Sequence, residues 1–138
     1  MNKILITALL LLPTSLWAAD DTATSWSLDA ARSAVNMVSI KKGHVAETHH
    51  FALLSGTITG HDAQLNIDLA SVETGIAKRN ERMKEHLFEV VTFATAVAHV
   101  TVDPAWLSLS TGTVKQVTTD VTVDLHGIKK TLSAALTV

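Results

Sequence analysis

The seven histidines are the side chains in this sequence whose chemistry first suggests a functional site. A zinc site needs three or four ligands that converge on the ion. His44, His49 and His50 are close in sequence, but His49 and His50 would point to opposite faces of a strand. The other four are scattered: His61, His86, His99 and His126. Since no His-Glu-x-x-His pattern occurs either, we expect exposed histidines, no metal and no cofactor.

Residue patterns for covalent or acid–base catalysis are also missing from the sequence. It has no cysteine, no Gly-x-Ser-x-Gly nucleophile motif and no glycine-rich phosphate loop. Asp120 and Asp124 fall on one outward strand face by parity, where we expect them to be solvated. We therefore predict no catalytic residue and no enzyme. The alternative is a histidine-dependent enzyme using His99 or His126 near the mouth of a lumen.

The first 18 residues have the three parts of a secretory signal peptide. Lys3 gives a positive start, residues 4–12 are apolar, and Pro13 precedes the small residue Ala18. The apolar run is shorter than the roughly 20 residues that a membrane-spanning helix needs. We predict cleavage after about Ala18 and a periplasmic or secreted protein. A buried N-terminal helix or an uncleaved anchor is the alternative.

The charge and cysteine content limit the partners and the stability of residues 19–138. Removing Lys3 with the leader leaves 10 basic against 13 acidic residues, a net charge of −3 with His neutral. This mild acidity argues against nucleic acid or an anionic membrane surface as a partner. Without disulfides, stability must come from burial, and about 120 residues suffice for one domain.

Strand patterns dominate residues 19–138. Residues 64–69 alternate, with Leu65, Ile67 and Leu69 on one side, and residues 121–125 do the same with Val121, Val123 and Leu125. Further strands are expected at residues 34–41, 51–59, 93–102, 113–125 and 128–138. Tight turns are expected at His126-Gly127 and at residues 60–62. The pattern predicts an all-β, mainly antiparallel sandwich or barrel.

Two segments depart from this strand pattern. Residues 42–48 are predicted to form a polar loop. Residues 78–90 carry charged residues around Met83 and Leu87, which are four apart and share one face of a helix. This segment is the one short amphipathic helix that we expect, and its charges are most simply a solvated face.

Several stretches together resemble the YceI-like family of exported lipid- and polyisoprenoid-binding proteins. The stretches are residues 26–29 (WSLD), 33–35 (SAV), 51, 56–58 (GTI), 69–75 (LASVETG), 79–83 (RNERM), 87–88 (LF) and 121–129 (VTVDLHGIK). The Ser-hydrophobic-x-Thr-Gly turn followed by Arg-Asn is the most specific of them. The resemblance covers residues 26–138 in order.

The resemblance implies a lipocalin-like antiparallel β-barrel with a short helix packed outside it. The family's barrel holds one long isoprenoid or other lipid tail in an apolar lumen. Family members continue through further strands that close the barrel, whereas this sequence ends at Val138. We therefore expect a C-terminally truncated chain, an incomplete barrel and an open apolar edge.

On this interpretation the protein is a periplasmic carrier whose partner is an apolar lipid, with a second copy of the chain as a further partner. Burial of a long tail contributes roughly 0.8 kcal/mol per CH₂ group, so binding needs no polar motif. The alternative is a ligand-free envelope stress or interaction protein with a filled lumen. The candidate ligand-lining residues are Val35, Met37, Phe51, Leu65, Ile67, Leu69, Val121, Val123 and Leu125.

Overall fold

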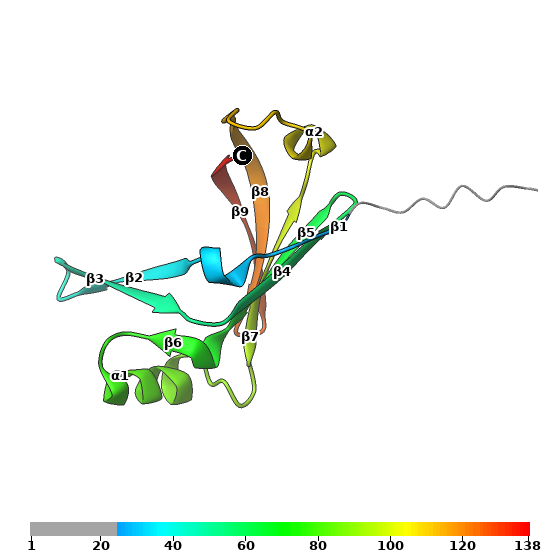
Figure 1. Cartoon of the computed structure of the whole chain (residues 1–138). Coiled ribbons are helices and arrows are strands. Elements are labelled where there is room, and N and C mark those ends of the chain that lie inside the picture. Colours follow the sequence, from blue (N-terminus) through cyan, green and yellow to red (C-terminus); the bar gives the residue numbers. More distant parts are fainter. Residues whose placement is uncertain (1–24) are drawn as a thin grey trace, which may run out of the picture.

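The computed structural model describes residues 25–138, which form two antiparallel sheets (Figure 1). The larger sheet has the strand order β1-β4-β5-β7-β8-β9. Its strands are β1 (Ser25–Ser27), β4 (Leu54–Thr59), β5 (Asp62–Asp68), β7 (Thr95–Thr101), β8 (Gln116–Leu125) and β9 (Ile128–Thr137). The smaller sheet has the order β2-β3-β6, with β2 (Val35–Lys41), β3 (Val45–Phe51) and β6 (Val72–Glu73).

The register of the larger sheet separates an apolar inner face from a polar outer face. Gly56 pairs with Leu65, Leu65 with Ala98, Ala98 with Val123, and Val123 with Lys130. The neighbouring cross-strand row, one residue further along each strand, points to the other face. It consists of Thr57, Gln64, His99, Thr122 and Thr131. Because side chains alternate along each strand, this register gathers the apolar residues on one side.

Two hairpins are closed by turns with positive φ at both central residues. His126 and Gly127 (φ 55° and 74°) join β8 to β9, and Lys42 and Gly43 (φ 52° and 76°) follow β2. Such backbone matches the twist of the paired strands and favours glycine at the second position. The predicted turn at His126-Gly127 is confirmed. The predicted loop at residues 42–48 is wrong: most of it belongs to β3, whose His49 and Phe51 are buried.

The predicted amphipathic helix is present as α1 (Ala77–Arg82) followed by a π-helical turn (Met83–Leu87). The Phe88 N–H donates to the Met83 carbonyl at 2.9 Å, five residues back rather than four. This wider turn shifts the buried face by one position. Phe88 is therefore 5% exposed and Leu87 is 55% exposed, so the pairing of Met83 with Leu87 on one buried face is wrong.

A compact core lies where the smaller sheet and the helix meet one end of the inner face. Its buried residues are Phe51, Leu69, Val72, Phe88 and Ala96. Val35, Met37, Leu54, Ile67, Met83 and Val90 pack against it. The rings of Phe51 and Phe88 are 5.8 Å apart and tilted, a favourable arrangement for an aromatic pair.

The described strands do not close a barrel. β1 and β9 are the two edges of the larger sheet, and the β2–β3 hairpin projects to one side (Figure 1). Ile128 and Leu132 on the β9 edge strand are 69% and 46% exposed. Short helical turns, Ala30–Arg32, Leu69–Ser71 and α2 (Pro104–Leu107), connect the strands. Within residues 25–138, no helix has the length and apolarity needed to cross a bilayer. The predicted leader lies outside the described residues.

Candidate ligand-binding groove

An open groove of about 550 Å³ lies on the inner face of the larger sheet, beyond the core. Residues of β4, β5, β7, β8 and β9 form its floor and one wall, and β1 with the residues after it forms the other wall. The lining residues are Trp26, Ser27, Leu28, Asp29, Gly56, Thr57, Ile58, Ala63, Gln64, Leu65, Ala98, Val100, Val121 and Leu136. The same face is thus covered by the core at one end and open at the other.

Small residues on the central strands make the face concave. Gly56, Ala63 and Ala98 lie on adjacent strands, and each is paired with a larger lining residue, Leu65 or Ile58 or Val100, so space is left beside these larger side chains. A Cβ atom at Gly56 would approach the Gln64 carbonyl oxygen to 2.8 Å, which forces the two strands apart. Glycine is therefore needed here for close backbone approach as well as for space.

The groove can hold a ligand by burying its apolar surface rather than by polar contacts. Asp29 is the only charged residue that lines it, and its carboxylate accepts the Ala31 N–H at 3.2 Å to cap the turn Ala30–Arg32. Ligand pockets are mostly apolar, with few polar groups to fix orientation. The groove fits this description and suits a long apolar chain.

The structure brings two predicted lining residues into the groove, Leu65 and Val121. Val123 lies on the same face, in the cross-strand row of Leu65 and Ala98. Sequence reasoning missed Trp26, Ile58, Ala63, Ala98, Val100 and Leu136. Strand parity could have found Ala63, because it precedes Leu65 by two residues in the same strand.

The other predicted lining residues lie elsewhere. Phe51 and Leu69 are buried in the core, and Val35, Met37 and Ile67 pack against it. Leu125 ends β8 and is 41% exposed beside the hairpin turn. None of these six residues lines the groove, and which residues contact a ligand stays a prediction.

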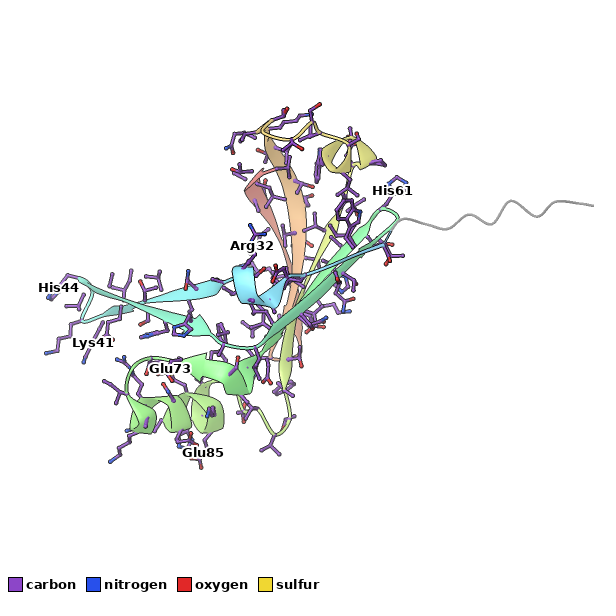
Figure 2. All side chains as sticks on the ribbon, viewed as in Figure 1. Arg32, Lys41, His44, His61, Glu73 and Glu85 are labelled. Carbon is purple, nitrogen blue, oxygen red and sulfur yellow. The ribbon has the colours of Figure 1, made fainter. Side chains whose placement is uncertain are left out.

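The histidines are dispersed, as Figure 2 shows for His44 at the tip of the β2–β3 hairpin and His61 at the β4–β5 turn. His49 is buried against the Ser39 hydroxyl, 3.0 Å from its Nε2, whereas His50 is exposed. Within residues 25–138, no three His, Cys, Asp or Glu side chains are grouped as metal ligands would be.

The two histidines considered for catalysis do not lie at the groove. His99 is exposed on the outer face, opposite the row of Leu65 and Ala98. His126 is in the β8–β9 turn, where its ring lies 4.3 Å from that of Phe93 and its Nε2 is 2.5 Å from a Glu89 carboxylate oxygen. Their predicted position near a lumen mouth is therefore wrong, because strand register and the hairpin place them elsewhere.

Residues 71–80, which contain the most specific of the family-like patterns, span the turn that joins β6 to α1. Arg79 donates to the Thr74 carbonyl at 2.6 Å and to Glu47 on β3 at 3.0 Å, which ties the helix to the smaller sheet. Hydrogen bonds from the Asn80 side chain and the Gly75 N–H lower the pKa of Glu73, which lies beside the helix in Figure 2.

Fold and groove together define a class: an antiparallel β protein whose inner sheet face is covered by a short helix and a small sheet at one end and forms an open apolar groove at the other. The YceI-like domain model matches residues 26–138, and the chain belongs to this family. A solved structure of a polyisoprenoid binding domain from Saccharophagus degradans, implicated in plant cell wall breakdown, is 45% identical with a TM-score of 0.78. The match covers 83% of this chain and 67% of that one. No curated protein matches the chain.

Proposed function

We propose that this protein is an exported carrier that holds one long apolar lipid, a polyisoprenoid, in the groove. The observation that carries the proposal is the open, almost uncharged groove of about 550 Å³ on a face that elsewhere forms the core. Its similarity to a polyisoprenoid binding domain supports the choice of ligand. The open volume of this groove favours a ligand-binding protein over a ligand-free protein with a filled lumen.

Binding by burial needs neither a catalytic group nor a metal. Each CH₂ group removed from water contributes roughly 0.8 kcal/mol, so a tail of several isoprene units gains enough to offset the loss of its freedom. The protein is then a binding protein and not an enzyme. Its sequence-predicted leader supports a periplasmic site of action, close to membranes that contain such lipids.

Native mass spectrometry of the protein purified from cells without detergent tests this function. We expect an added mass that is lost on organic extraction, and an isoprenoid chain in the extract. A protein that is consistently empty, and that takes up no polyprenol when mixed with it, would contradict the proposal. Sequencing the amino terminus of the same material tests cleavage near residue 18.

A further inference from the structure

The inner face of the larger sheet carries a single charged side chain, Lys130 on β9. Strand register places Lys130 opposite Val123, in the row that continues through Ala98, Leu65 and Gly56. The inner positions of β4, β5, β7 and β8 carry no charge, and those of β9 carry only this one. A cation thus stands at the edge of an otherwise uncharged surface.

Lys130 is close enough to the groove to reach a ligand in it. Gly56, Leu65 and Ala98 of its row line the groove. Two strand spacings of about 4.8 Å separate Lys130 from Ala98, a distance of about 10 Å. The flexible lysine stem can lie along apolar surface while its ammonium group stays in water. The side chain can therefore accompany the polar end of an amphiphile whose tail occupies the groove.

The neighbouring lysine has a different environment. Lys129 is on the outer face, where its ammonium group is 3.9 Å from the Asp124 carboxylate. Within residues 25–138, Lys130 makes no such ion pair. Its charge is free for an external anion, whereas the charge of Lys129 is partly compensated.

We propose that Lys130 selects an amphiphile with an anionic head group, a phosphate or carboxylate, and orients it with the head at the β9 edge. The tail then extends along Leu65 and Val121 toward Trp26. The one acidic lining residue, Asp29, belongs to the opposite wall, so an anionic head group is repelled there and attracted to Lys130. This inference rests on the proposed function and adds the charge and direction of the ligand.

The test compares geranylgeranyl phosphate with geranylgeraniol, which share a tail and differ in the head group. Binding is followed by the fluorescence of Trp26 in a Trp106→Phe background. We expect the phosphate to bind roughly tenfold more tightly, as one charge-assisted contact allows, and the preference to fall at high salt. Lys130→Gln should remove the preference and leave the affinity for the alcohol unchanged.

Lys129→Gln is the matched control, one residue away on the other face, and should retain the preference. Equal affinities for the two probes in the unaltered protein, or a preference that survives Lys130→Gln, would overturn the role of Lys130 and leave the carrier function standing. If the preference is lost in Arg32→Gln but kept in Lys130→Gln, the head group lies at the wall formed by β1 and the residues after it. That result would also overturn the role of Lys130. Binding of neither probe would contradict the carrier function itself.

Discussion

The side-chain carbonyl of Asn80 accepts two hydrogen bonds from Thr74, one from its N–H at 2.9 Å and one from its hydroxyl at 2.6 Å. Asn80 is 8% exposed, so this pair of bonds is largely shielded from water. It fixes the turn after β6 to the first turn of α1. The specific sequence stretch around Gly75 and Asn80 thus stabilises the scaffold beside the core.

Replacing Asn80 by Ala should lower the free energy of unfolding by about 1–3 kcal/mol, because the Thr74 N–H loses its partner in a shielded position. Chemical denaturation measures the change. The control is Glu81→Ala, which removes an exposed ion pair with Lys84 and should cost less than about 1 kcal/mol. Equal effects of the two substitutions would contradict a structural role for Asn80.

The lowered pKa of Glu73 predicts a dependence of stability on pH. Its causes are hydrogen bonds from the Asn80 side chain and the Gly75 N–H, which place the pKa below the ordinary value of 4.5. A carboxyl group whose pKa is depressed on folding stabilises the folded protein above its unfolded pKa, and this stabilisation is lost as the pH falls through the folded pKa. Glu73→Gln should therefore be less stable than the parent at pH 7, and the difference should shrink in acid. A difference that grows in acid would refute this.

The two hairpin turns allow a matched test of glycine at positive φ. Gly127 and Gly43 have φ values of 74° and 76°, but a Cβ at Gly127 would lie 3.0 Å from the Phe93 ring, whereas one at Gly43 meets nothing within 4 Å. Both alanine variants place a residue with a Cβ atom in left-handed backbone, which lowers the free energy of unfolding by about 1–2 kcal/mol. Gly127→Ala should be the more destabilising in thermal unfolding, because it also displaces Phe93. Equal losses would show that Phe93 adjusts freely.

Filling the groove should abolish lipid binding. Ala98→Trp places a large ring over the floor, while His99→Trp adds the same ring on the outer face one residue away. We expect uptake of polyprenol to fall at least tenfold in Ala98→Trp and to persist in His99→Trp. Circular dichroism checks that both variants fold. Binding that survives Ala98→Trp would place the ligand elsewhere.

Strand alternation predicted which residues share the inner face of the sheet. It could not predict which of them are buried in the core and which line the groove. Leu65, Ile67 and Leu69 read alike in sequence, yet Leu65 lines the groove and Leu69 is 1% exposed in the core. The difference comes from what covers each end of the face: β2, β3, β6 and the helix cover one end, through contacts between residues far apart in sequence. Periodicity within one strand carries no information on such coverage.

The errors in the predicted elements also have physical causes. The π-helical turn moved Phe88 into the position that regular helical spacing assigns to Leu87, and no residue pattern marked this change. The polar composition of residues 42–48 suggested a loop, but in β3 only one face is buried, so a strand with several polar residues is stable there. The His126-Gly127 hairpin was predictable, because its turn type is specified by two adjacent residues.

The inner face continues from packed core to open groove without a break. Lipid bound in the groove would therefore stabilise the folded protein and lengthen its lifetime against proteolysis. A tail in the groove adds contacts to the same layer that Ala96 and Ile67 begin, and it has no comparable site on an unfolded chain. At a lipid concentration 100 times its Kd, the loaded form gains about 2.7 kcal/mol over the empty one. Proteases that cut transiently opened chains would remove empty copies first. The amount of protein that persists would then report how much lipid is available to it.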